Sequence, residues 1–134
     1  MEELTRDADE LLRSGRRGVF RRASMPATVL LAELLSGRVV GFAEVDLRPF
    51  ADGCRSSPVG YLEGWYVVPE YRRKGVGRAL VRRAESWVQD RGCTEMGSDT
   101  ELENAISQEA HRALGYREVN RLVHLRRTLR GQPE

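Results

Sequence analysis

The residues best suited to chemistry lie together in the stretch RRKGVGR, residues 72–78. Gly75 and Gly77 allow the backbone to approach a ligand closely, and the first amides of a following helix point towards an anion. The flanking basic side chains are Arg72, Arg73, Lys74 and Arg78. The stretch therefore predicts a cradle for a pyrophosphate, although it matches neither the GxxxxGK[ST] loop nor the GxGxxG turn. A solvated basic turn before a helix is the alternative.

Two carboxylates could serve an amine or a proton transfer. Glu63 lies within the apolar run from Tyr61 to Val68, where its neighbours predict burial on both faces of a sheet. A carboxylate is costly there unless it is used or paired, so a salt bridge to an arginine is the alternative. Asp99 follows the next expected strand, at the edge where open sheets bind ligands, and a helix cap is its alternative role.

Asn104 and His111 are separated by two helical turns and should share one face of a helix. A histidine, with an ordinary pKa of about 6.5, can supply a proton near neutral pH, and a purely structural histidine fits the pattern equally well. Neither Cys54 nor Cys93 has an activating neighbour in the sequence, so we expect no thiol chemistry.

The hydrophobic periodicity places these residues on a strand–loop–helix unit. β-branched and aromatic residues predict a strand over 60–69 that ends at its proline. After the basic loop, the apolar period becomes that of a helix from Val76 to Arg91, and Gly92 suits its C-cap.

The remaining elements follow from turn signals and from the same periodicities. They are a helix over 2–14, a basic turn over 16–26, a hairpin of strands 28–35 and 38–47 turning at Ser36-Gly37, a loop over 48–59, a strand over 94–98, a helix from a Thr100–Glu103 capping box to Leu114 with Gly115 as C-cap, and strands over 116–119 and 122–129. This order predicts one α+β domain over 1–134, a mixed and mainly antiparallel sheet flanked by helices.

Composition narrows the classes of function. The net charge is only +2, with the arginines scattered, so no strong field favours nucleic acid. No apolar run has membrane-spanning length, and the N-terminus lacks the apolar core of a signal peptide. Two distant cysteines suggest the cytoplasm with reduced thiols, and two histidines without ligand spacing predict no metal site.

Two motifs in order resemble the GNAT superfamily of N-acetyltransferases. The first is a strand ending in Val-Val-Pro, followed by Arg72-x-x-Gly75-x-Gly77 and an amphipathic helix, which resembles that family's coenzyme A loop. The second, from Asn104 to Leu114-Gly115-Tyr116, resembles its closing helix. From about Gly41 to Leu129, segments such as 61–64 and 97–100 resemble the aminoglycoside 6'-N-acetyltransferases, antibiotic-resistance enzymes.

The resemblance implies transfer of acetyl from acetyl-CoA to the 6'-amine of an aminoglycoside by direct attack in a ternary complex. It implies that Glu63 acts as a base for the amine, that Asp99 meets the acceptor's amines, and that His111 replaces a tyrosine acid. The residues implied for coenzyme binding are Trp65, Tyr66, Val67, Arg72, Arg73, Lys74, Gly75, Val76, Gly77, Arg78 and Asn104.

The resemblance also implies a homodimer built with the C-terminal strands, and by comparison with the family we expect the chain to lack the usual first strand and helix. Glu44, Asp46 and Asp52 could add negative charge for a polycation, with solvated surface as the default interpretation. Two alternatives stay open: another acceptor, such as a polyamine or a protein amine, and a non-catalytic module that binds acyl-CoA or aminoglycosides.

Overall fold

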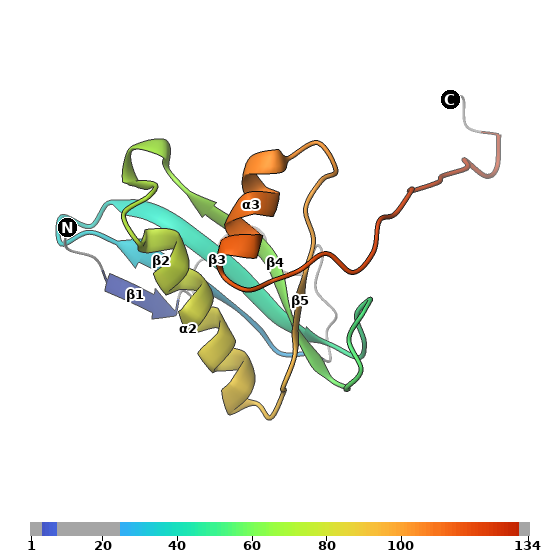
Figure 1. Cartoon of the computed structure of the whole chain (residues 1–134), viewed down its shortest axis with the longest axis horizontal. Helices are drawn as coiled ribbons and strands as arrows, with labels where there is room; N and C mark the ends of the chain where they lie inside the picture. The colour runs from blue at the N-terminus through green and yellow to red at the C-terminus, as the bar shows by residue number, and fades with distance from the viewer. Residues whose placement is uncertain (1–3, 8–24, 132–134) are drawn as a thin grey trace.

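The computed structural model describes residues 4–7 and 25–131, and these form one sheet with two helices on it (Figure 1). The strands are β1 Leu4–Asp7, β2 Ala27–Glu33, β3 Val39–Arg48, β4 Val59–Val67 and β5 Met96–Ser98. The helices are α2 Val76–Asp90 and α3 Ala105–Ala113, with a 3-10 turn, η2, at Pro69–Tyr71. The predicted α+β fold with a mixed, mainly antiparallel sheet is confirmed.

The five strands are ordered β1-β2-β3-β4-β5, and all neighbours are antiparallel except β4 and β5. The β2–β3 hairpin turns at Ser36-Gly37, as its sequence predicts, with Gly37 at a positive φ of 96°. The β4–β5 pair is parallel because α2 crosses over between them. The three remaining pairings make the sheet mainly antiparallel.

Helix α2 crosses one face of the sheet and supplies much of the core (Figure 1). Its stripe of buried residues is Val76, Leu80, Val81, Ala84 and Val88. Gly60 in β4 allows the close approach, because a Cβ at that position would come within 2.4 Å of the Val88 side chain. The helix ends one residue before the predicted limit, and Gly92 takes the predicted left-handed conformation, with φ of 88°.

Strand β4 changes neighbours along its length. It pairs with β3 over its whole span, but with β5 only through Gly60–Leu62. The register with β3 shifts between Glu44, which faces Gly64, and Val45, which faces Leu62. Glu63 is therefore the extra residue of a β-bulge, a feature that bends a strand and re-aims a side chain. The last pair of β4 with β5, Leu62 with Ser98, comes one residue before Glu63.

The helix predicted over 2–14 is wrong at its first turn. Residues 4–7 form β1, which pairs with Leu30–Glu33 of β2, while residues 8–14 lie outside the described residues, as do residues 16–24 of the predicted basic turn. A weak helical period is readily overridden by pairing with an open sheet edge. The sheet consequently has one strand more beside β2 than the sequence predicts.

The capping box predicted at Thr100 and Glu103 is also wrong. Helix α3 begins at Ala105, and its N-cap is Asn104, whose Oδ1 accepts a hydrogen bond from the Ser107 backbone N–H at 3.0 Å. An asparagine cap satisfies a free amide as well as a threonine does, so the local pattern could not separate the two. Gly115, with φ of 97°, ends this helix region as predicted.

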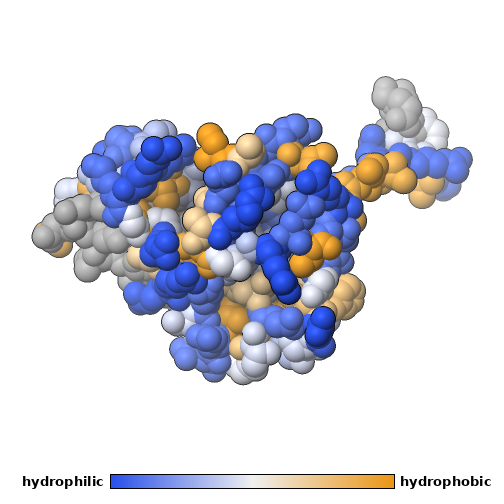
Figure 2. Space-filling view, in the orientation of Figure 1, coloured by the Kyte–Doolittle hydropathy of each residue, from blue (hydrophilic) through white to orange (hydrophobic). Residues whose placement is uncertain are grey.

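The strands predicted over 116–119 and 122–129 do not form. After α3 the chain runs without strand pairing over residues 117–129, meets the β3–β4 loop at Asn120, and then extends away from the body (Figure 1). Its alternating pattern is suitable for a strand, but a strand needs a neighbour for its backbone groups. Apolar side chains remain exposed along it, as Figure 2 shows: Val119, Leu122, Val123, Leu125 and Leu129.

Among the residues that the structure describes, no helix is long and apolar enough to span a membrane.

Candidate active site

The predicted anion cradle is built at the start of α2. Gly75 is the N-cap residue, with φ of 90°, and its carbonyl accepts the first helical bond, from Ala79 N–H, at 3.0 Å. The amides of residues 76–78 precede that bond and therefore remain available at the positive end of the helix dipole. A Cβ at Gly75 would meet nothing within 4 Å, so glycine is required there by the backbone angle and not by crowding.

The basic residues of the loop have different roles: Arg72 contacts the protein itself, and the others are exposed. Arg72 donates from Nε to the Val67 carbonyl at 2.7 Å, and its guanidinium lies over the Tyr66 ring at 5.2 Å. Arg72 therefore fastens the loop to the end of β4. Arg73, Lys74 and Arg78 are exposed at the rim of the helix start, where they add positive charge.

Trp65 of β4 contacts both helices, α2 through Gly77 and α3 through His111. The Trp65 indole N–H donates to the Gly77 carbonyl at 3.2 Å, and its ring packs edge-on against His111, with 5.2 Å between centroids. The structure thus brings the predicted β4, loop and α3 residues together. Tyr116, on the other side of His111, bonds to Glu85 of α2, and its pKa is raised strongly, mainly by burial; it is a packing residue, as predicted.

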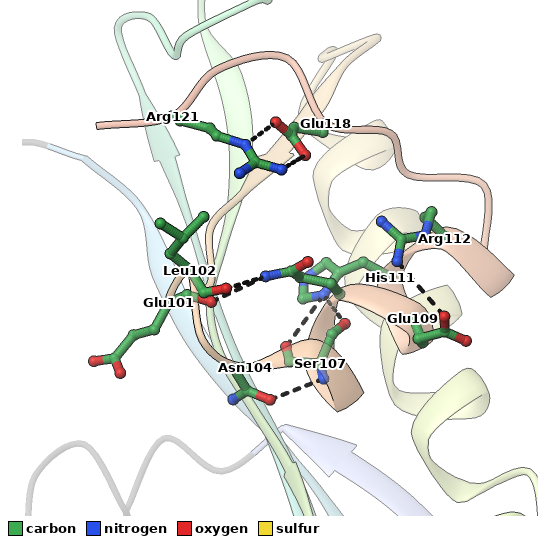
Figure 3. Close-up of polar contacts among 10 residues, drawn as sticks. Glu101, Leu102, Asn104, Ser107, Glu109, His111, Arg112, Glu118 and Arg121 are labelled. Atoms are coloured by element: carbon green, nitrogen blue, oxygen red, sulfur yellow. Dashed lines mark hydrogen bonds and ion pairs between the residues drawn. The ribbon is translucent and has the colours of Figure 1, made fainter. Parts of the chain in front are cut away.

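His111 is held by two serines that the sequence analysis did not single out. Its Nδ1 lies 2.8 Å from the Ser107 carbonyl, an acceptor, so Nδ1 carries a proton (Figure 3). Its Nε2 lies 2.9 Å from Ser98 Oγ, which also reaches the Leu62 carbonyl at 3.2 Å. The imidazole is neutral when Ser98 donates to Nε2, and protonated when Ser98 donates to Leu62 and accepts from Nε2. The contact with Ser98 can therefore accommodate both states.

Four side chains form a second cluster at the bulge. Arg48 donates from Nε and Nη2 to the two Glu63 carboxylate oxygens, each at 2.9 Å. Its guanidinium lies 3.5 Å from the centre of the Tyr61 ring, and the Tyr61 hydroxyl donates to Asp99 Oδ2 at 2.7 Å. Burial, with help from the bond to Asp99, raises the pKa of Tyr61 far above its ordinary value, so this hydroxyl stays a donor.

The neighbours of Glu63 predict burial on both faces of the sheet, and this prediction is wrong. Its side chain is 29% exposed, at the extra residue of the bulge. The salt bridge that the sequence left open is present, with Arg48 as partner. No local pattern marks this contact, since it depends on the bulge. Catalytic use of Glu63 stays a prediction.

Helix α3 is capped by Asn104 and not by Asp99. The cap of α3 is Asn104 (Figure 3), and Asp99 instead accepts the Tyr61 hydroxyl bond, so the alternative of a capping Asp99 is wrong. Oδ1 of Asn104 is used by the cap, which leaves the amide NH₂ group as the part that could meet a ligand. Contact of Asn104 with a coenzyme, and of Asp99 with an acceptor, remain predictions.

The other candidate acids and thiols differ in burial. Asp46 is buried at 7% exposure, against the surface default, while Asp52 is exposed and accepts a bond from Asn120 at 2.8 Å. Cys54 and Cys93 are both free thiols, and burial raises the pKa of each, which disfavours the reactive thiolate. Within the described part of the chain, no group of three or more His, Cys, Asp or Glu residues could hold a metal ion.

Comparison with known proteins gives one consistent answer. Residues 2–116 match the model of the acetyltransferase (GNAT) family. The chain is 50% identical over 108 residues to an aminoglycoside N(6')-acetyltransferase type 1 of Klebsiella aerogenes, covering 81% of this chain and 71% of that protein. It is 46% identical over 108 residues to the Stenotrophomonas maltophilia protein of the same name, covering 80% and 71%.

Solved structures agree with the sequences. An aminoglycoside 6'-N-acetyltransferase from Acinetobacter haemolyticus has a TM-score of 0.72 at 39% identity, covering 78% of this chain and 72% of that one. An acetyltransferase solved with a bisubstrate analogue, CoA-S-monomethyl-acetylneamine, has a TM-score of 0.78 at 31% identity, covering 96% and 99%. With this fold, this site and these relatives, the chain belongs to the GNAT family of acetyltransferases.

Proposed function

We propose that this chain transfers the acetyl group of acetyl-CoA to the 6'-amine of aminoglycosides. The observation that carries the proposal is that β4 runs on to Val67 after its pairing with β5 ends at Leu62, with the start of α2 bonded to it through Trp65 and a carboxylate cluster at its bulge. The 50% identity with the Klebsiella aerogenes protein, whose name states this activity, supports the choice of acceptor. Together they favour an enzyme over a passive binding module, which would need no base for an amine.

The coenzyme would lie beside the end of β4 that no longer pairs with β5. The free amides of residues 76–78 and the side chains of Arg73, Lys74 and Arg78 would bind its pyrophosphate. Beyond Leu62, the edge of β4 no longer pairs with β5, so the backbone of residues 65–67 can receive the pantetheine arm as an added strand. The NH₂ group of Asn104 is the side-chain donor we assign to that arm.

The chemistry requires a free amine. An alkylammonium, with a pKa of about 10, is protonated near neutral pH and cannot attack. In our proposal Glu63 takes that proton, and the amine nitrogen then bonds to the thioester carbonyl carbon. The carbon–sulfur bond breaks, the nitrogen loses its second proton to water, and the thiolate receives a proton from His111, whose Nε2 can be protonated while Ser98 accepts from it. Asp99 binds a further ammonium of the acceptor.

The assembly and the compartment belong to the same proposal. We assign a homodimer in which the exposed apolar side chains of residues 122–129 are covered by a second copy. The two free, partly or fully buried cysteines are compatible with a reducing compartment, and we assign the cytoplasm.

A thiol-release assay with acetyl-CoA and kanamycin A tests the activity. We expect stoichiometric release of coenzyme A, and a product that carries one acetyl group on the 6'-nitrogen by nuclear magnetic resonance. Spermidine and a peptide with a free N-terminus serve as alternative acceptors. Release with one of these but not with kanamycin would reassign the acceptor, and coenzyme binding without any release would favour the binding module.

A further inference from the structure

The cluster at the bulge already contains a cation. Arg48, the last residue of β3, forms two charge-assisted hydrogen bonds of 2.9 Å with Glu63 and lies on the face of the Tyr61 ring. On the far side of this contact, the Tyr61 hydroxyl leads to a second carboxylate, Asp99. A carboxylate beside an aromatic face is the combination that binds an organic ammonium or guanidinium group. Arg48 therefore occupies a place suited to a ligand's cation.

The contact can exchange with a solute. The side chains of Arg48 and Glu63 are 26% and 29% exposed, so water and small cations reach both. A partly exposed ion pair contributes little net free energy, because its charges are also solvated when apart. The arginine side chain has several rotatable bonds, so the guanidinium can leave Glu63 without any movement of β3.

We propose that Arg48 is a specificity-determining residue that competes with the acceptor's ammonium group for Glu63. This inference rests on the proposed function, because it takes Glu63 as the group that receives the acceptor amine. Arg48, Glu63 and Asp99 together carry one positive and two negative charges, so the cluster has one net negative charge.

The competition favours acceptors with several positive charges. An acceptor with one ammonium group gains the Glu63 contact only by breaking the one with Arg48, so its net electrostatic gain is small. An acceptor with further ammonium groups also interacts with Asp99, and this second attraction offsets the displacement of Arg48. Arg48 thus selects polycationic amines over monoamines of the same shape at the reacting sugar.

Arg48→Gln tests this directly. The acceptors are kanamycin A and the methyl glycoside of 6-amino-6-deoxyglucose, a monoamine with the same reacting group. We expect KM to fall by roughly threefold for kanamycin and about tenfold for the monoamine, with kcat for both unchanged, because a freed carboxylate attracts either cation. Arg121→Gln is the matched control. Arg121 forms two hydrogen bonds with Glu118 outside the site, so its loss should leave both KM values unchanged.

The outcomes separate the inference from the proposed function. A fall in kcat at constant KM, or a KM that rises, would show that Arg48 orients Glu63, and would overturn the inference. If Arg48→Gln unfolds by circular dichroism, Arg48→Lys replaces it; lysine keeps the charge but loses the paired bonds, and an unchanged KM would again overturn the inference.

Binding measurements extend the test to the case of an inactive protein. If the wild-type chain acetylates neither amine, the proposed function fails, and calorimetry with the same two amines decides the role of Arg48. Tighter binding to Arg48→Gln than to the wild-type chain would support the competition, and equal or weaker binding would overturn it.

Discussion

Glu63 is the single extra residue of β4 at its bulge against β3, and its carboxylate is paired with Arg48. If this carboxylate removes the proton of the acceptor, Glu63→Gln should lower kcat by roughly a hundredfold near neutral pH. The loss should shrink as pH rises, because more of the amine is then free without a base. A pH profile of kcat for both proteins measures this.

Glu118→Gln is the control for that substitution, since it also breaks a carboxylate–arginine pair, that with Arg121, but outside the site. Its pH profile should match that of the wild-type chain. Full activity of Glu63→Gln at neutral pH would leave Glu63 as the partner of Arg48 in a structural ion pair.

Asp99 should act on binding instead of on the chemical step. Its carboxylate accepts the Tyr61 hydroxyl bond, and asparagine can still accept that bond through its carbonyl oxygen while losing the charge. We expect Asp99→Asn to raise KM for kanamycin by roughly tenfold at low salt, with little change in kcat. The effect should diminish as salt screens the lost attraction. A kcat defect that does not depend on salt would contradict this role.

Residue types and positions made Glu63, Asp99 and His111 candidates, and the resemblance to the GNAT family implied roles for them that stay predictions. Their partners were not predictable in the same way. Arg48 meets Glu63 only through the bulge, and Ser98 meets His111 only through the short parallel pairing of β5 with β4. Ser107 was the exception, since it precedes His111 by one helical turn.

At the scale of elements, the unit from β4 to α2 was predicted almost to the residue. The strand has β-branched and aromatic residues, the helix has a clear apolar stripe, and glycines mark both helix ends. The weaker segments failed for a common reason. β1 and the residues after α3 depend on which sheet edge is available, and this information is not local.

The start of α2 gives a test at this scale. Gly75→Asp would put a negative charge beside amides that we assign to the coenzyme's pyrophosphate. We expect acetyl-CoA binding to weaken by roughly a hundredfold or more, which corresponds to about 3 kcal/mol. Isothermal titration calorimetry measures the affinity.

Gly75→Ala separates charge from strain. Both variants must adopt the positive φ of 90°, which side chains disfavour, but a Cβ there meets nothing within 4 Å. Alanine should therefore bind acetyl-CoA much more tightly than aspartate does. Equal weakening in the two variants would assign the effect to the backbone and not to an anion site.

On the scale of the whole molecule, the sheet is well covered by α2 but the C-terminal segment is not part of the body. Its alternation of apolar and polar residues over 122–129 is that of a strand with one face to be buried. Leu125 is 90% exposed, and its neighbours Leu122, Val123 and Leu129 are also exposed. A contiguous apolar segment of this kind is uncommon on a monomer in water.

A second copy of the chain can cover this segment and offer the backbone partners that a strand requires. We therefore expect analytical ultracentrifugation at micromolar concentration to show a dimer. Leu125→Lys should shift the equilibrium to the monomer, because it places a charge on the face to be buried. Leu35→Lys, at a leucine 71% exposed beside the hairpin turn, is the control and should leave the dimer intact. A wild-type chain that sediments only as a monomer would refute the assembly, and the exposed leucines would then need another partner.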